Sequence, residues 1–166
     1  MSDESVLKHV MAGSNAPAVC AEPRRRVELD SGEALRLLGS VSLGRIVFTR
    51  HALPTVRPVN HVLDGDDIVI RTHEGAALTS RTRQAGSPGV VVAYEADDID
   101  PDTHLGWSVV VTGYAHLVTD ARDLARCQGM LRPWVHQTMD HAVRIRPDLV
   151  TGFLLTTADD IAPADG

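Results

Sequence analysis

Polar residues interrupt the stretch TVRPVNHVLDGDDIVIRTHEGAAL, residues 55–78. It reads as two β-strands around a tight turn, yet Pro58 lies inside the first strand, followed by Asn60 and His61. A proline interrupts the pairing of a strand, and such a gap lets a ligand reach the backbone. The second strand ends in Arg71 and Thr72, which taken alone are more often a solvated charge and an ordinary strand residue. These polar residues are the first candidates for a binding site.

Other kinds of site chemistry find little support. There are eight histidines, but His136 and His141 are five residues apart rather than the four that a helical zinc motif uses. Cys20 and Cys127 have no partner at ligand spacing, so we expect no metal site. Ser108 does not lie in a strand-to-helix nucleophile turn. The glycine-rich motifs of dinucleotide and triphosphate sites are absent, and no residue is identified as catalytic.

The elements that position the candidate residues are mostly strands. Asp30 and Glu33 form a capping-box pattern before a short helix that Gly39 ends. The Asp64-Gly65 pair predicts a hairpin turn, and Gly113 predicts a bulge in a long strand. Further strands are expected over residues 44–50, 90–96, 107–119 and 142–158, with helices near 75–84 and 121–132. Because helices and strands do not alternate as in a parallel sheet, we predict a mainly β fold, a small six-stranded antiparallel barrel with a few short helices.

Composition limits the class of protein. The chain has 166 residues, 43% hydrophobic, which suits one well-buried domain. We expect a flexible tail over residues 1–27, the barrel domain over 28–158 and a short tail over 159–166. The net charge of −6 argues against binding to nucleic acid. No apolar run approaches a membrane span and no signal peptide is recognisable, so a cytoplasmic protein is expected.

Four segments occur in the order of one known family: VSLGRIVF, RPVNHVLDGDDIVIRTHEGAAL, YEADDIDPDTHLGWSVVVTGYAHLVTD and RIRPDLVTG. Together they resemble the pyridoxamine 5′-phosphate oxidase-like FMN-binding split β-barrel proteins. The resemblance spans residues 29–156 and is greatest to the small actinobacterial branch, which is related to the nitroimidazole-resistance flavoproteins. It implies a six-stranded split barrel that binds FMN and acts as an oxidoreductase on a small molecule.

The resemblance also implies a set of cofactor contacts. The first hairpin strand would lie along the flavin ring, whose polar edge needs hydrogen-bond partners such as the Val59 amide and the Asn60 side chain. The second strand and the following helix start would hold the phosphate. The residues expected to contact the cofactor are Arg57, Pro58, Val59, Asn60, Arg71, Thr72, Ala77, Leu78, Arg81 and Trp107. His61 points away from Asn60 in a regular strand, which favours packing or substrate contact.

Two positions depart from the family pattern. Relatives commonly have a lysine where this chain has Ala77, and often an arginine where it has Phe153. Arg81 or Arg83 would then supply the missing phosphate charge. Nothing after Gly152 resembles the substrate segment of a true pyridoxamine phosphate oxidase. Two alternatives remain open: a deazaflavin-dependent reductase, and a non-catalytic dimer that binds flavin or haem.

The resemblance also implies a homodimer. Segments such as VVVAY and WSVVV offer more apolar strand surface than one thin core covers. Related split barrels pair face to face and hold two flavins in the grooves between them. Trp107 is expected to reach the flavin of the neighbouring subunit.

Overall fold

A computed structural model describes residues 24–72, 78, 89–131 and 139–158. The described elements in chain order are β1 (Arg24–Glu28), α1 (Ser31–Leu38), β2 (Leu43–Arg50), β3 (Leu53–Asp64), β4 (Asp67–Thr72), β5 (Val90–Ile99), β6 (Gly106–Leu117), α3 (Ala121–Met130) and β7 (His141–Thr157). The helix expected near residues 75–84 falls almost wholly outside the described part of the chain.

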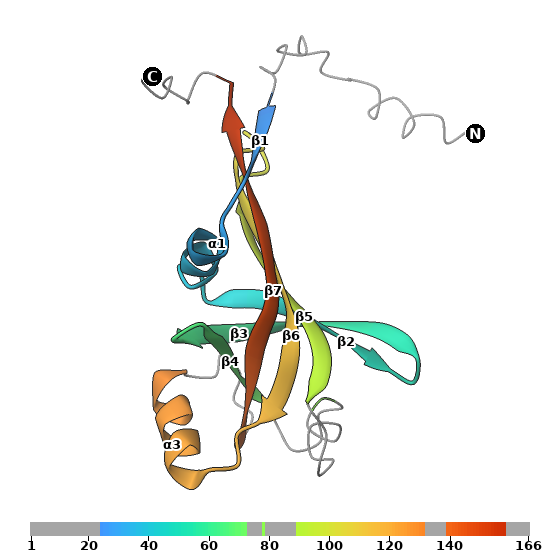
Figure 1. Cartoon of the computed structure of the whole chain (residues 1–166), viewed down its shortest axis with the longest axis vertical. Helices are drawn as coiled ribbons and strands as arrows, with labels where there is room; N and C mark the ends of the chain where they lie inside the picture. Colours follow the sequence, from blue (N-terminus) through green and yellow to red (C-terminus); the bar gives the residue numbers. More distant parts are fainter. Residues whose placement is uncertain (1–23, 73–77, 79–88, 132–138, 159–166) are drawn as a thin grey trace, which may run out of the picture.

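The strands form one antiparallel sheet that closes on itself. Its order is β1-β7-β4-β3-β2-β5-β6, and β6 pairs again with β7. Six strands therefore make a closed ring, and β1 is an additional strand on β7 (Figure 1). This arrangement confirms the predicted six-stranded antiparallel split barrel.

Three predictions of local structure are also confirmed. Gly65 adopts a positive φ of 64° in the hairpin where Asp64 pairs with Asp67. The register of β6 against β7 shifts between Thr112 and Gly113, which is the predicted bulge. Asp30 caps α1, since its side chain accepts a hydrogen bond from the Glu33 amide at 2.9 Å.

The flexible tail expected over residues 1–27 is too long, because its last four residues form part of a strand. Residues 24–27 belong to β1, which pairs with residues 154–157 of β7. The Arg26 guanidinium lies over the Phe153 ring, 4.4 Å from its centroid, and Arg26 pairs with Glu28 at 3.0 Å. The three arginines of this strand hide its pairing from sequence patterns, because no apolar alternation marks it.

The barrel interior holds one large apolar cluster, and a smaller one lies beside α3. The first includes Ile46, Tyr94, Val109 and Ile145, all nearly inaccessible to solvent. The second joins Cys127 of α3 to Val69 and Ala142 of the sheet and to Val118, which follows β6. The two clusters fix α1 and α3 against the ring on which the candidate site is built.

Candidate functional site

One edge of β3 is unpaired among the strands that the structure describes. β2 borders β3 from Leu53 to Asn60, whereas β4 pairs with β3 only from His61 onward. The His61 amide donates to the Ser42 carbonyl at 2.9 Å. Because hydrogen-bonded pairs alternate along an antiparallel ladder, residues 55, 57 and 59 also turn their backbone groups towards β2. The backbone groups of residues 54, 56 and 58 face the other side, which we call the open edge of β3.

The open edge explains the proline inside the strand. The missing N–H of Pro58 faces the open edge, so it removes no hydrogen bond between β2 and β3. The same register turns the Val59 amide towards Gly44. A ligand along this edge would therefore meet the Pro58 carbonyl and the Val56 backbone, not the Val59 amide. This geometry corrects the role expected for Val59, which packs partly buried against the core.

Arg71 and Thr72 end β4 close to the open edge, with Thr72 paired to His141. The Arg71 guanidinium donates through Nη1 to the Leu131 carbonyl at 3.2 Å and through Nη2 to the Met139 carbonyl. Its Nε is buried and has no hydrogen-bond partner among the described residues. Buried N–H groups almost always have an acceptor. Three of the five guanidinium N–H groups therefore have no assigned acceptor in the described part of the chain.

The other expected cofactor contacts have different placements. Arg57 is exposed and Asn60 half-buried on β3. Leu78 is buried in the core cluster. Ala77, Arg81 and Arg83 lie outside the described residues.

Trp107 does not reach outward as expected. Only 7% of its surface is exposed, and it belongs to the core cluster. Side chains alternate along a strand, and Trp107 shares the inward face of β6 with buried Val109 and Val111. The expected contact with a neighbouring subunit's flavin is corrected for this reason.

A buried histidine and tyrosine lie beneath β3. His61 is 3% exposed, and its Nε2 lies 2.9 Å from the Leu38 carbonyl. The carbonyl can only accept, so Nε2 carries the proton and Nδ1 accepts from the Tyr94 hydroxyl at 2.7 Å. Burial lowers the pKa of His61, which keeps the imidazole neutral. The packing role expected for His61 is confirmed.

Because Gly44 has no side chain, it leaves space for the Tyr94 hydroxyl to approach β3. A Cβ at position 44 would lie 2.5 Å from the Tyr94 hydroxyl oxygen and 2.7 Å from the Glu95 carbonyl oxygen. Sequence reasoning missed Tyr94 because it lies 33 residues from His61 and only the sheet register brings them together. A glycine inside a strand marks a close approach, and Gly44 was the signal that could have found it.

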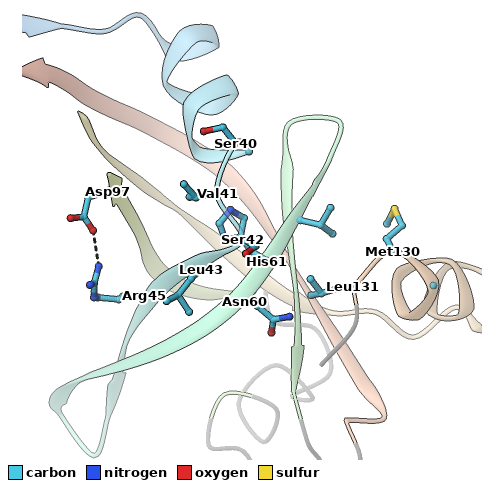
Figure 2. Close-up of a pocket in the computed structure, with 13 residues that line it drawn as sticks. Ser40, Val41, Ser42, Leu43, Arg45, Asn60, His61, Asp97, Met130 and Leu131 are labelled. Atoms are coloured by element: carbon cyan, nitrogen blue, oxygen red, sulfur yellow. Dashed lines mark hydrogen bonds and ion pairs between the residues drawn. The ribbon is translucent and has the colours of Figure 1, made fainter. Parts of the chain in front are cut away.

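A cavity of about 840 Å³ opens beside this pair (Figure 2). Its walls come from the α1–β2 connection, from β2 and β3, from one β5 residue and from the end of α3. The lining residues are Gly39, Ser40, Val41, Ser42, Leu43, Arg45, Asn60, His61, Val62, Asp97, Gly129, Met130 and Leu131. The volume lies within the range of small-molecule sites.

An ion-pair cluster stands at one side of the cavity. Arg45 Nη1 lies 2.9 Å from Glu95 Oε2 and 2.8 Å from Asp97 Oδ1. Partial burial raises the pKa of the Glu95 carboxyl, although Arg45 opposes this shift. One guanidinium therefore serves two carboxylates.

Comparison with known proteins places this geometry in a family. The family model for pyridoxamine 5′-phosphate oxidase matches residues 30–154. The chain belongs to this family of pyridoxamine 5′-phosphate oxidase-like proteins. It is 51% identical over 140 residues to an uncharacterised protein of Mycobacterium tuberculosis, covering 84% of this chain and 91% of that protein.

Similar solved structures agree with this assignment. A Corynebacterium glutamicum protein that carries the family name is 34% identical, with a TM-score of 0.67. That match covers 81% of this chain and 96% of the other. An FAD-binding protein of Mycobacterium smegmatis is 32% identical, with a TM-score of 0.58. The match covers 78% of this chain and 98% of the M. smegmatis chain.

The described residues contain no group of three or more His, Cys, Asp or Glu side chains that could hold a metal ion. Within the same residues, no helix has the length and apolar character needed to cross a membrane.

Proposed function

We propose that this family member binds a flavin between the open edge of β3 and the end of β4, and that it is a flavin-dependent oxidoreductase. The buried Arg71 Nε beside that edge carries the proposal, because it is a donor without an acceptor in the described part of the chain. A phosphate oxygen is a strong acceptor for a guanidinium N–H. The residues present therefore fit the phosphate of a flavin cofactor.

Each part of the site would have a separate task. Arg71 and Thr72 would hold the phosphate, with Ala77, Leu78 and Arg81 as further expected contacts. Arg57, Pro58 and Asn60 would orient the ring along the open edge, where carbonyls at residues 56 and 58 accept and the Val56 amide donates. A bound flavin supplies the electron-transfer chemistry, and the protein supplies position and polar surroundings.

FMN is the flavin we propose. FAD is a second candidate, because the M. smegmatis relative is an FAD-binding protein. A deazaflavin cofactor and a non-catalytic flavin- or haem-binding role stay open as alternatives. The absorbance spectrum of the purified protein separates them, since a flavin, a deazaflavin and a haem absorb in different regions.

We also propose a homodimer with its flavin sites at the subunit interface. The cross-strand row Val56, Val47, Ala93, Thr112 and Leu149 runs over the outside of five strands. Val56 and Leu149 are 56% and 57% exposed at its two ends, and Val91 beside it is 61% exposed. Exposed apolar side chains gathered on one face are typical of a protein interface, and a two-fold axis would pair this face with itself.

Titration of the apoprotein with FMN tests the cofactor site. Arg71→Ala is expected to weaken binding by ~1.5–3 kcal/mol, about ten- to hundredfold, the scale of a charged hydrogen bond. Arg36→Ala is the control, because Arg36 is an exposed helix residue on the α1 surface. A circular-dichroism melt checks that Arg71→Ala still folds, since Arg71 also binds two carbonyls. Unchanged FMN affinity in a folded Arg71→Ala protein would contradict the proposed phosphate site.

A further inference from the structure

The cavity described above adjoins the proposed flavin position. Asn60 lines the cavity and is also the residue next to the open edge of β3 (Figure 2). Leu131 lines it too, and its carbonyl accepts from Arg71. The cavity therefore borders both the strand that we assign to the flavin ring and the Leu131 carbonyl that holds Arg71.

Helix carbonyls and a carboxylate contribute acceptors to the cavity wall. α3 ends at Met130, and Gly129 and Met130 belong to the wall. The last carbonyls of a helix have no partner inside it and carry partial negative charge. α3 has no basic residue in its last turn. Asp97 adds a carboxylate to the same wall.

The cation of the described wall is already paired with carboxylates. Arg45 is the cation among the described lining residues, and it contacts both Glu95 and Asp97. These three side chains carry a net charge of −1 when ionised, from one guanidinium and two carboxylates. Both ring nitrogens of His61 are bonded inside the protein, and the Ser40 hydroxyl donates to the Leu37 carbonyl at 2.6 Å.

Apolar side chains complete the wall and remain partly open. Leu43 is 44% exposed and Met130 38% exposed, on opposite sides of the cavity from β2 and α3. Val41, Val62 and Leu131 also contribute apolar surface. A flat apolar group placed between Leu43 and Met130 would cover surface that is otherwise in contact with water.

We propose that this cavity is a small-molecule site for an apolar ring or chain that bears a neutral or cationic N–H group, such as an amide, amine or amidine. The N–H group would face Asp97 and the carboxyl end of α3, and the apolar part would lie between Leu43 and Met130. A phosphorylated or carboxylate ligand is disfavoured, because Arg45, the cation among the described lining residues, is already paired with two carboxylates. That the ligand is also the substrate rests on the proposed flavin function.

Three ring compounds that differ in charge test the site: benzamidine, benzamide and benzoate. The full chain is labelled with ¹³C at its methionine methyl groups, and the Met130 signal is assigned with Met130→Leu. Benzamidine is expected to shift the Met130 signal at the lowest concentration, benzamide at a higher one and benzoate not at all. The titrations are run with and without bound FMN.

Two variants and a control identify the groups responsible. Asp97→Asn is expected to weaken benzamidine binding about tenfold, the scale of one lost charge-assisted contact, and to leave benzamide unchanged. Arg45→Gln is expected to strengthen benzamidine binding, because it frees both carboxylates. Asp98→Asn is the matched control, since Asp98 is the exposed next residue and does not line the cavity.

Each outcome decides one part of the proposal. Benzoate binding as tightly as benzamidine, or an Asp97→Asn protein with full benzamidine affinity, would overturn the assigned ligand class. No Met130 shift with any compound would overturn the site itself. Probe binding by a protein that takes up no flavin would support the cavity and contradict the flavin function. Flavin uptake without probe binding would support the flavin function and contradict the proposed cavity site.

Discussion

Replacement of Tyr94 by Phe removes a single buried hydroxyl from the pair beneath β3. Its hydrogen bond to His61 Nδ1 measures 2.7 Å, and both residues are almost fully buried. The histidine cannot adapt by changing tautomer, because the Leu38 carbonyl needs the Nε2 proton. Nδ1 is then a buried acceptor without a donor, which costs ~1–3 kcal/mol.

The expected loss is measurable by melting. A decrease of about 2 kcal/mol lowers the Tm of a chain of this size by about 4–8 °C. Urea unfolding gives the free energy directly and checks that the m-value is unchanged. Tyr114→Phe is the matched control, because the chain has two tyrosines and Tyr114 is 36% exposed. A Tyr94→Phe protein as stable as Tyr114→Phe would refute the hydrogen-bond reasoning.

Three further predictions concern the same region and the assembly. Because burial lowers the pKa of His61, the unfolded chain binds a proton below its ordinary pKa of 6.5 that the folded chain does not. Stability is therefore expected to fall as pH decreases below about 6.5, by up to about 1.4 kcal/mol per pH unit, and His61→Gln should remove this part of the slope in urea titrations at several pH values. Gly44→Ala is expected to cost about 1–3 kcal/mol, because its Cβ meets the Tyr94 hydroxyl and the Glu95 backbone; Gly129→Ala, which meets nothing within 4 Å on α3, should leave stability equal or higher in the same melts. Light scattering at micromolar concentration is expected to give twice the chain mass of 17.9 kDa, and a single species at 17.9 kDa with flavin bound would contradict the shared-site dimer.

Local sequence signals predicted the features that depend on local geometry. Asp64-Gly65 makes a turn wherever it separates two strands, and Gly113 tolerates a bulge in any strand. Asp30 caps a helix through its own side chain. The conformational preferences of these residues are local, so the turn, the bulge and the cap could be predicted without knowing the rest of the fold.

Features that depend on register could not be predicted in this way. His61 and Tyr94 meet because β2 lies between their strands, and Trp107 is buried because the barrel closes over its face of β6. β1 forms because β7 extends far enough to pair with it. The direction of the Val59 amide follows from which residue of β2 lies opposite, and a shift of one residue would reverse it.

The pairing of β7 has a consequence for the order of folding. This last strand contacts β4 through residues 141–145, β6 through 143–155 and β1 through 153–157. Neither the closed ring nor the pairing of β1 can form before β7 is in place. Until then the apolar surfaces of the earlier strands stay exposed to solvent. Long-range pairing of this kind slows folding, because the chain entropy is lost before the contacts form. During synthesis the partly made barrel would expose the edges of β4 and β6, and aggregation at this stage is a hazard that ends only when residues 141–157 leave the ribosome.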